Sequence, residues 1–453
     1  MNSHLDWSAY EGGSDFGFGF GDAFGAPVEP GSGFGKAAAA CNGKLQCLSD
    51  EHEVMCPSYR ATQDPRHSTH HRALTLQAAA EGRLGEHAYA SAEMIEALAL
   101  CVGCKGCKRE CPNGVDMALM VAEAHARRWQ AVGKVPLRER MFARMPELAP
   151  HLARVRSLLR LRDKIPGAAR LLERVLGIAA ARSLPRPAEQ AFLDRAPVEH
   201  DGTAGEVVLL VDTFSNHFDP ELAEAAQAVL VAAGYRVHLA RPQDGGRALC
   251  CGRSYLSSGF VEQARAEASR MVAALMPHVE RGLPVIGLEP SCLLMLRDEY
   301  HALGLGSAVA ALARSALLLE EFLAREHDAG RLTFRFPDQA GRRVLVHGHC
   351  HQKAFGVMSA MHKVLGLIPG LEVRTVDSSC CGMGGSFGYK AEHFEVSMAM
   401  AEASLLPAVR GAAPDTAIVA NGTSCRHQIL DGAGRPAQHL AHLVHAALGH
   451  GRT

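Results

Sequence analysis

Hydrophobic residues recur at three- and four-residue spacing in the chain that follows Cys41. The stretch ASAEMIEALALC leads up to Cys101, and VDMALMVAEAHARRW follows Cys111. This spacing is typical of amphipathic helices, and no convincing strand run interrupts it. The pattern therefore predicts a small all-α unit over residues 41–130, in which cysteine-bearing loops join the helices.

The segments on either side of this unit differ from it. Residues 131–204 are rich in Arg and Leu and have helical periodicity, as in MFARMPELAPHLARVRSLLRLRDKI. Prolines interrupt this segment. We expect a helical connector there. Residues 1–40 contain the Gly- and Phe-rich stretch GGSDFGFGFGDAFG, which has a period of neither 2 nor 3.6, and we expect a flexible arm.

After Glu206 the pattern changes to short, apolar, β-branched runs separated by helical stretches. The runs are GEVVLLVDTF, YRVHLA and PVIGLEP, and then RRVLVHGH, LEVRTVDS and TAIVANGTS. Alternation of strands with helices predicts βαβ units around a parallel sheet. We therefore expect two α/β domains, over residues 205–330 and 331–453.

The cysteines repeat with these strands. Cys250-Cys251-Gly252 and Cys380-Cys381-Gly382 lie 130 positions apart, and Cys292 precedes Cys425 by 133 positions. Such a fixed offset indicates two similar domains in tandem. When LLVDTFS is overlaid on VLVHGHC, Ser215 of the first copy takes the place of Cys350.

Charge and composition exclude several classes of protein. The 47 Lys and Arg residues balance 48 Asp and Glu residues, so the chain offers no basic field to a nucleic-acid backbone. No apolar run reaches the roughly 18 residues of a membrane-spanning helix, and the N-terminus lacks the layout of a secretory signal. We expect a cytoplasmic globular protein that binds no nucleic acid.

The 14 cysteines indicate metal ligands or redox thiols, because a reducing compartment disfavours disulfides. Cys101, Cys104, Cys107 and Cys111 form the run C-x2-C-x2-C-x3-C-P. Three thiolates on one tight loop can each take a corner of a cubane, while the fourth, before proline, turns toward a second cluster. A structural zinc site, the alternative, usually closes with two separated C-x2-C pairs. The motif predicts an iron–sulfur site.

Cross-ligation requires a second motif, which is present in degraded form as Cys41-Asn-Gly-Lys-Leu-Gln-Cys47, followed by Cys56-Pro57. One [4Fe–4S] cluster would be held by Cys101, Cys104, Cys107 and Cys56. The other would have three ligands, Cys41, Cys47 and Cys111, because Lys44 stands where a middle cysteine is expected.

The three-thiolate site leaves alternatives open. It is compatible with a [3Fe–4S] cluster, or with a [4Fe–4S] cluster that an oxygen or nitrogen ligand completes. Asp50 and His52 lie close enough in sequence to be candidates for that ligand. In the remaining alternative the site is empty and its cysteines are packing residues.

The cysteines of the second α/β copy each follow a predicted strand, and they are Cys350, Cys380, Cys381 and Cys425. Loops at the carboxyl ends of parallel strands converge on one crevice, so these thiols can meet. Adjacent cysteines rarely form a disulfide with each other, whereas neighbouring thiolates can bind metal. We expect a metal or iron–sulfur centre here, with inert buried thiols or a metal-free dithiol as alternatives.

Two further features surround this centre. In the first copy, Cys250, Cys251 and Cys292 lack a fourth thiol, which favours a structural copy without a cluster. In the second copy, the histidines at positions 347, 349 and 351 alternate around Cys350. On a strand end they would share one side, where they either ligate or relay protons, or shape the loop by hydrogen bonds.

In combination, these motifs resemble a known group. The chain is similar to the iron–sulfur subunits or domains of FAD-linked 2-hydroxyacid dehydrogenases, the glycolate oxidase iron–sulfur subunit group. It shares cysteine-rich CCG domains with heterodisulfide reductase and anaerobic glycerol-3-phosphate dehydrogenase subunits. The resemblance covers about residues 41–450 and rests on CNGKLQC, MCPSYRATQDPRHSTHHRA, CVGCKGCKRECPNGVDM, CCGR, HGHCHQKA, SCCGMGGSFGY and GTSCRHQI.

The resemblance implies a multidomain α plus α/β fold, with an N-terminal α-helical ferredoxin-like unit followed by two tandem cysteine-rich domains. By the same resemblance, Cys350, Cys380, Cys381 and Cys425 match cluster-binding positions and would form a redox centre. Two positions depart from the pattern of heterodisulfide reductase. Gly422 replaces the first cysteine of a C-x2-C pair, which leaves that pattern one thiolate short, and Ser215 argues against a second centre in the first copy.

The function that the resemblance implies is electron transfer. Electrons from a 2-hydroxyacid such as lactate, glycolate or 2-hydroxyglutarate would reach the clusters from the FAD of a partner chain, because only low-complexity sequence precedes Cys41. The acceptor would be quinone, reached by at most peripheral association with the inner face of the membrane. The alternatives are a heterodisulfide-reductase-like subunit that reduces a disulfide at the CCG site, and a metal-binding scaffold without electron transfer.

Overall fold

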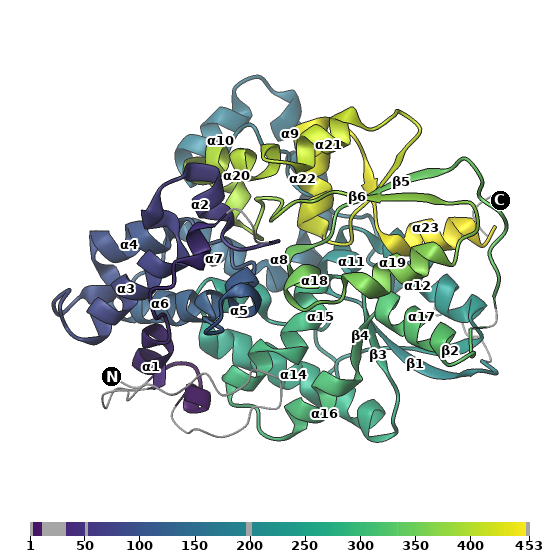
Figure 1. The fold of residues 1–453 in the computed structure, drawn as a ribbon, viewed down its shortest axis with the longest axis horizontal. Coiled ribbons are helices and arrows are strands. Elements are labelled where there is room, and N and C mark those ends of the chain that lie inside the picture. Colours follow the sequence, from purple (N-terminus) through teal and green to yellow (C-terminus); the bar gives the residue numbers. More distant parts are fainter. Residues whose placement is uncertain (1–2, 11–32, 50–52, 196–201, 333, 450–453) are drawn as a thin grey trace.

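The computed structural model describes residues 3–10, 33–49, 53–195, 202–332 and 334–449. In the ribbon of Figure 1, the purple and blue N-terminal helices lie beside two α/β units, one teal and the other green and yellow. The predicted fold class is therefore confirmed in outline, as a helical N-terminal part followed by two α/β repeats. The finer expectation of a ferredoxin-like chain path remains a prediction.

Capping side chains determine where helices of the N-terminal unit begin. Ser68 accepts a hydrogen bond from the amide N–H of His71 at the start of α3, and Asp116 accepts that of Leu119 at the start of α6. Gly133 ends α6 with φ of 67°, in the left-handed region that glycine tolerates. The described helices here are α1 (Gly33–Ala39), α2 (Pro57–Thr62), α3 (Thr69–Ala80), α4 (Ala92–Ala99), α5 (Gly106–Glu110) and α6 (Met117–Val132).

The expected flexible arm is packed against this unit at both of its described ends. Trp7 and Phe34 are buried in the core, with their rings 5.2 Å apart in an edge-on arrangement. The Glu123 carboxylate of α6 accepts the backbone N–H of Leu5 at 2.9 Å. Aromatic burial of this kind stabilises both segments, so residues 3–10 and 33–40 belong to the folded unit. The Gly- and Phe-rich stretch over residues 11–32 lies outside the described residues.

Each α/β unit contains a four-stranded parallel sheet, with strand orders β2-β1-β3-β4 and β6-β5-β7-β8. Alternate residues of β1 pack on opposite faces: Val208 joins the cluster that contains Met271 of α14, while Val207 joins the one that contains Val229 of α12. Helices therefore cover both faces of the sheet, which explains the continuous apolar run at residues 207–210 of the central strand β1. The repeated strand order matches the repeat predicted from the cysteines.

The bounds of these elements follow. The first unit comprises β1 (Gly205–Leu210), α11 (Thr213–His217), α12 (Pro220–Ala232), β2 (Tyr235–Leu239), α13 (Arg253–Ser257), α14 (Val261–Glu280), β3 (Val285–Gly287), α15 (Pro290–Arg297), α16 (Ala308–Ser315), β4 (Ala316–Leu318) and α17 (Leu319–Asp328). The second comprises β5 (Arg343–Val346), α18 (Cys350–Ala354), α19 (Met358–Gly366), β6 (Glu372–Thr375), α20 (Phe394–Glu402), α21 (Leu405–Gly411), β7 (Ala417–Val419), α22 (Thr423–Ala433), β8 (Ala437–Gln438) and α23 (Leu440–Ala447). Between the helical unit and the sheets lie α7 (Leu137–Ala143), α8 (Met145–Leu152), α9 (Arg156–Lys164) and α10 (Ala168–Leu176).

A buried ion cluster joins the helical unit to the first α/β unit. The Lys105 ammonium, at the start of α5, lies 2.8 Å from Asp116 Oδ2 and 2.9 Å from Asp298 Oδ2. Its Nζ is also 3.3 Å from a carboxylate oxygen of Glu299, in the 3-10 helix Glu299–Leu303. Burial alone would lower the pKa of Lys105, but these carboxylates raise it well above its usual value. The ammonium therefore stays charged and holds the two units together.

We expect Lys105→Met to destabilise the protein by about 3–5 kcal/mol, because it removes the fully buried cation shared by Asp116, Asp298 and Glu299 and leaves Lys108 and Arg253 to balance three buried carboxylates. The measurement is anaerobic denaturant unfolding followed by circular dichroism, with iron content determined in parallel. The exposed pair between Arg343 and Asp415 provides the control, since Arg343→Met should cost less than about 1 kcal/mol. Equal costs for the two substitutions would show that the buried cluster contributes nothing beyond a surface pair.

Candidate metal centres

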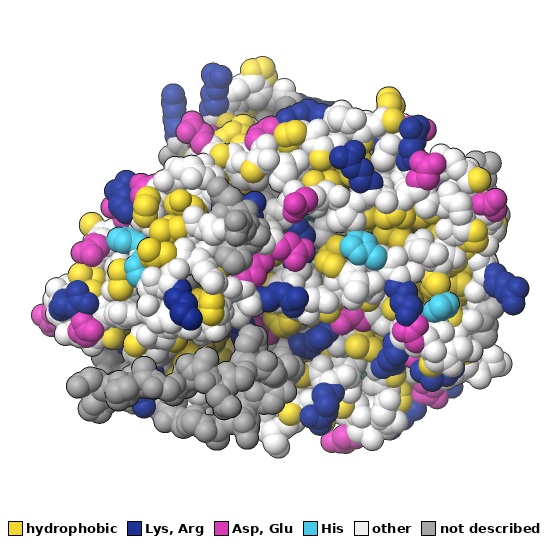
Figure 2. All heavy atoms as spheres, viewed as in Figure 1, with side chains coloured by type: hydrophobic (Ala, Val, Ile, Leu, Met, Phe, Trp, Pro, Cys, Tyr) yellow, Lys and Arg dark blue, Asp and Glu magenta, His cyan; other side chains and the backbone are white. Residues whose placement is uncertain are grey.

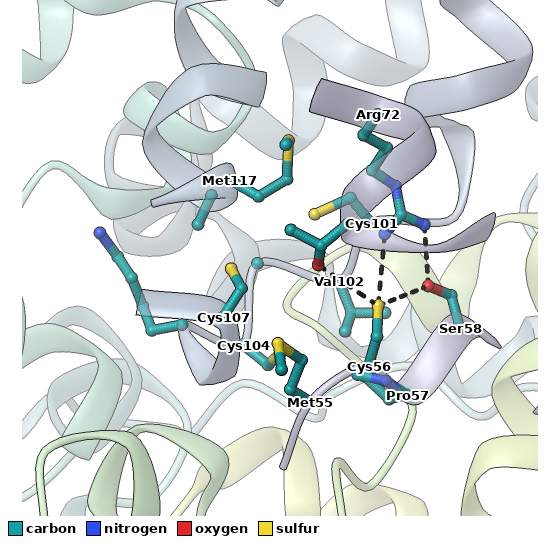
Figure 3. A pocket seen from close by; sticks show the side chains of 14 residues that line it. Met55, Cys56, Pro57, Ser58, Arg72, Cys101, Val102, Cys104, Cys107 and Met117 are labelled. Atoms are coloured by element: carbon teal, nitrogen blue, oxygen red, sulfur yellow. Dashed lines mark hydrogen bonds between the residues drawn. The ribbon is translucent and has the colours of Figure 1, made fainter. Parts of the chain in front are cut away.

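Four cysteine side chains from two separate stretches of the chain line one cavity (Figure 3). Cys56 immediately precedes α2, whereas Cys101, Cys104 and Cys107 lie on the loop that enters α5 and on α5 itself. In the close-up their sulfur atoms surround a common space. The structure thus brings together the four residues from which the sequence predicts one cluster.

Arg72 of α3 places a buried positive charge at this cavity. Its Nη1 donates to Cys56 Sγ at 3.4 Å, and its Nη2 donates to Ser58 Oγ at 2.8 Å (Figure 3). Burial alone would raise the pKa of the Cys56 thiol, but the Arg72 guanidinium and the Ser58 hydroxyl lower it below its usual value. Cys56 is therefore prepared to act as a thiolate, and the cation offsets negative charge at the site.

The remaining thiols of the cavity have the opposite tendency. Burial is the largest influence on the pKa values of Cys101, Cys104 and Cys107, and it raises all three. Such thiols lose their protons when a metal binds them. Four convergent sulfurs beside a guanidinium constitute a donor set that fits a [4Fe–4S] cubane.

A second cysteine group lies nearby, around the start of α3. Burial and then the neighbouring Cys111 raise the pKa of the Cys41 thiol, and Cys41 Sγ lies 3.3 Å from Nδ1 of His70. Cys47 Sγ accepts the backbone N–H of His70 at 3.3 Å. The structure thus brings the three predicted thiols to one place and adds an imidazole.

His70 is not among the ligands that the cysteine motifs predict. The side chain of Lys44, at the position of the missing cysteine, is exposed, and Asp50 and His52 lie outside the described residues. The sequence did contain a signal, because the histidine pair in STHHRA opens a helix shortly after Cys56. Its relation to Cys41 depends on how α3 packs, which sequence spacing does not reveal.

The four thiols of the second α/β unit meet at the carboxyl edge of its sheet, as predicted. They are buried and form a row in which Cys350 contacts Cys380, Cys380 contacts Cys381, and Cys381 contacts Cys425. The strands β5, β6 and β7 each end shortly before one of these residues. Parallel strands thereby deliver thiols that are distant in sequence to one crevice.

The histidines around Cys350 do not share one side, contrary to the expectation from a strand end. The strand β5 ends before them, and His349 caps α18 by accepting the backbone N–H of His351 at 3.1 Å. The ligand atoms of these two histidines group with Cys350, whereas His347 groups with Cys381 and Cys425, each group within 4.8 Å. The cause of the difference is the turn between β5 and α18.

His347 supplies a test of whether this centre suits a metal. Its Nδ1 lies 2.9 Å from Ser378 Oγ, and its buried Nε2 has no hydrogen-bond partner among the described residues. A buried polar atom without a partner is costly unless it binds something. Thiols and an imidazole in contact are donors that suit iron or zinc, so the residues present fit a metal centre.

In the first α/β unit the corresponding place holds fewer donors. Cys251 contacts both Cys250 and Cys292, but Ser215 donates its hydroxyl hydrogen to Asp212 Oδ2 at 2.5 Å. Burial and then the carboxylate of Glu289 raise the pKa of Asp212 to about 6. The serine is therefore occupied in a hydrogen bond at the position where the second unit presents a thiol.

The cluster loop of the helical unit lies directly against the thiols of the second α/β unit. Cys104 packs in one small apolar group with Val54, Cys350 and Cys380. Helix α5 packs against α18 near the centre of the molecule (Figure 1), and Ser379 Oγ donates to the backbone oxygen of Val54 at 2.5 Å. The cavity of Figure 3 and the row of thiols are therefore neighbours.

Carboxylates of the first α/β unit reach the second near these thiols. Glu289 accepts the backbone N–H of Thr423 at 2.8 Å, and its other oxygen lies 4.0 Å from His349 Nε2. Glu320 accepts a hydrogen bond from Asn421 Nδ2 at 3.0 Å. These contacts fix how the two units face one another.

On the face drawn in Figure 2, Lys and Arg side chains are interspersed with Asp and Glu side chains. The helices α9 and α10 and the turn between them expose apolar side chains, among them Leu161, Ile165, Leu171 and Val175. Among the described residues, no helix combines the length and the apolar character needed to cross a membrane.

Comparison with protein families places these sites in known domains. Residues 37–115 match the model of the 4Fe-4S dicluster domain. Residues 213–297 and 344–430 each match the model of the cysteine-rich domain. The chain therefore combines a dicluster domain with a repeated cysteine-rich domain, and iron–sulfur clusters are the cofactors of this combination.

Several curated relatives have similar sequences. D-2-hydroxyglutarate dehydrogenase of Pseudomonas putida is 26% identical over 90% of this chain and 43% of its own length. A subunit of the anaerobic glycerol-3-phosphate dehydrogenase of Escherichia coli is 28% identical over 61% of this chain and 69% of its own. Lactate utilization protein A of an Exiguobacterium species is 26% identical over 42% of this chain and 77% of its own.

These matches confirm the resemblance inferred from the motifs, and they support an oxidoreductase type of role for this iron–sulfur protein. The chain spans less than half the length of the dehydrogenase relative from P. putida.

We expect Arg72→Met to lower the reduction potential of the cluster to which these four thiols are suited, because it removes a buried cation beside Cys56. One such charge at an effective dielectric constant near 20 contributes roughly 1–3 kcal/mol, or about 40–130 mV for one electron. An EPR-monitored redox titration measures the shift. Arg72→Lys keeps the charge and should retain most of the potential, and identical potentials in all three proteins would contradict the role of the guanidinium.

Proposed function

We propose that the chain is the iron–sulfur electron-transfer subunit of a flavin-dependent 2-hydroxyacid dehydrogenase. It receives electrons from the FAD of a partner protein and passes them to an acceptor such as quinone. The observation that carries the proposal is the contact of Cys104 with Cys350 and Cys380. A redox relay requires such contiguity, because the cofactors do the chemistry while the protein sets their spacing.

The residues of the relay follow from the three groups of donors. One [4Fe–4S] cluster is held by Cys56, Cys101, Cys104 and Cys107, and a second has Cys41, Cys47 and Cys111. The third group, Cys350, Cys380, Cys381 and Cys425, forms the redox centre nearest the acceptor. When bound, each cluster supplies one-electron chemistry that links a two-electron flavin to a two-electron acceptor.

The exposure of the three groups supports a direction of transfer. The loop between Cys41 and Cys47 is exposed, so the second cluster is accessible to a partner protein. One of its three cysteines is buried, compared with two of the four of the first cluster and all four of the second cysteine-rich domain. Electrons therefore enter at Cys41, Cys47 and Cys111, and they leave through the second cysteine-rich domain.

The substrate class and the flavin partner rest on the relatives. Two of them are named dehydrogenases, one of these is named as a subunit, and another relative is named for lactate utilization. We therefore place the flavin on a separate chain and take the substrate to be a lactate-, glycolate- or 2-hydroxyglutarate-type acid.

If the acceptor is a membrane quinone, the protein must associate with the membrane surface, and we place it peripherally at the cytoplasmic face. The apolar residues exposed on α9 and α10 are flanked by the exposed basic residues Lys164, Arg170 and Arg174. Apolar side chains beside cations favour the surface of an anionic bilayer.

A disulfide reductase is the second candidate function. It is favoured by the row of thiols and by the buried imidazoles of His347 and His351, whose Nε2 atoms lack partners among the described residues. Reduction of a disulfide consumes two electrons and two protons. Burial lowers the pKa of His347 and His351 well below the usual value, so these neutral imidazoles would relay protons that come from solvent. The substrate would then react at the thiols themselves.

Reconstitution with a candidate FAD-linked dehydrogenase tests the relay. Addition of the hydroxyacid should bleach the visible absorption of the clusters, and a quinone analogue should restore it. Cys380→Ser should slow quinone reduction at least about tenfold while the N-terminal clusters still bleach, because it removes a donor only from the last centre. Cys250→Ser, from the first cysteine-rich domain, is the matched control and should leave the rate unchanged.

Two outcomes would count against the relay. Clusters that stay oxidised after hydroxyacid is added would exclude this source of electrons. Disulfide turnover that Cys380→Ser abolishes, without any quinone reduction by the wild type, would favour the reductase instead.

The membrane site is tested with vesicles. The protein should co-float with vesicles that contain anionic lipid but not with neutral vesicles, because basic side chains contribute about 1 kcal/mol each at an anionic surface. Leu171→Glu combined with Val175→Glu should reduce the bound fraction several-fold. Unchanged binding by this variant would place the lipid contact elsewhere.

A further inference from the structure

Among the described residues, the second N-terminal donor group offers three thiols. A [4Fe–4S] cluster needs a ligand for each of its four irons. Cys41, Cys47 and Cys111 provide three of them, and the side chain of Lys44 extends into solvent. Since an ammonium has no lone pair to offer, Lys44 is unsuited to the fourth position.

His70 contacts two of the three cysteines through two different atoms. Its ring nitrogen Nδ1 lies 3.3 Å from Cys41 Sγ, and its backbone N–H donates to Cys47 Sγ at 3.3 Å. The backbone contact arises because His70 lies in the first turn of α3, where amide groups have no partner within the helix. It fixes the residue in place, so that the imidazole is presented to Cys41.

The loop between Cys41 and Cys47 closes over this ring. A Cβ atom built on Gly43, which has φ of 74°, would lie 3.9 Å from Cε1 of His70. The ring is thus held between the loop and α3, on the same side as the thiols.

Two other polar side chains at this place, Ser68 and Asn113, are hydrogen-bonded to the backbone. The Ser68 hydroxyl lies in hydrogen-bond contact with Cys47, but it already donates to the backbone oxygen of Pro65 at 2.7 Å and accepts the backbone N–H of His71. The Asn113 amide donates to the backbone oxygen of Ala40 at 2.6 Å. Among the described side chains, His70 therefore presents the nitrogen best placed to complete the group.

We propose that Nδ1 of His70 is the fourth ligand of the second cluster. The inference rests on the proposed second cluster and goes beyond it by naming the atom that completes it. A neutral imidazole in place of a thiolate leaves the cluster with one less negative charge. Net charge is one of the main determinants of cluster potential, so the cluster accepts an electron at a higher potential than its four-thiolate counterpart would.

The experiment compares wild type with three variants of the full chain, purified anaerobically. Pulsed EPR of the reduced protein, with and without ¹⁵N-histidine labelling, detects a nitrogen bound directly to iron. His71→Ala is the matched control, because His71 is the next residue on α3 and its side chain makes none of the hydrogen bonds to the three thiols found among the described residues.

We expect strong histidine nitrogen coupling in wild type and in His71→Ala, and its loss in His70→Ala and His70→Cys. His70→Ala should lose about one iron per chain and show a [3Fe–4S] signal when oxidised. His70→Cys should keep its iron, and its second cluster should shift to a lower potential. This variant also keeps the test valid if the alanine variant folds poorly.

The outcomes separate this ligand from the function on which it rests. A second cluster in wild type whose nitrogen coupling survives in both His70 variants would overturn the ligand and leave the relay intact. A wild-type protein with a single reducible N-terminal cluster would overturn both the second cluster and its ligand. Weak coupling that disappears without any loss of iron or shift in potential would reduce His70 to a hydrogen-bond donor and would also overturn the proposal.

Discussion

The position of the cluster loop depends on one buried charge. The ammonium of Lys105 lies inside the C-x2-C-x2-C run, and its partners Asp116 and Asp298 belong to different units of the fold. A buried cation is costly unless carboxylates surround it, so the loop has one low-energy position against the first α/β unit. That position brings Cys104, the residue before the lysine, against the thiols of the second α/β unit.

The parts of the fold that sequence could predict are those that repeat or that carry a local period. The strands that precede Cys350, Cys380 and Cys425 are short apolar runs, and the parallel sheet that they form follows from alternation with helices. The two copies were visible because their cysteine pairs recur at one offset. The grouping of Cys56 with the C-x2-C run followed from the chemistry of cross-ligation rather than from periodicity.

The parts that sequence could not predict are contacts between side chains far apart in the chain. Arg72 contacts Cys56 because α3 packs across the cavity, and His70 reaches Cys41 from the same helix. Trp7 belongs to the core although glycine-rich sequence follows it, because Phe34 returns to pack against its ring. In each case the neighbouring sequence does not reveal the partner, since the interaction forms only when the tertiary fold brings the two residues together.

The first cysteine-rich domain retains a role although it lacks the leading thiol. Its carboxylates reach outward to both neighbours: Asp298 binds Lys105 of the cluster loop, while Glu289 and Glu320 accept hydrogen bonds from the second cysteine-rich domain. Buried carboxylates impose a defined geometry, because each must find its donor or pay a desolvation cost. A duplicated domain that has no complete thiol set can therefore be kept as the frame that holds two redox sites in contact. The difference between Ser215 and Cys350 then separates two roles. The first copy positions the redox centres, and the second copy contains one of them.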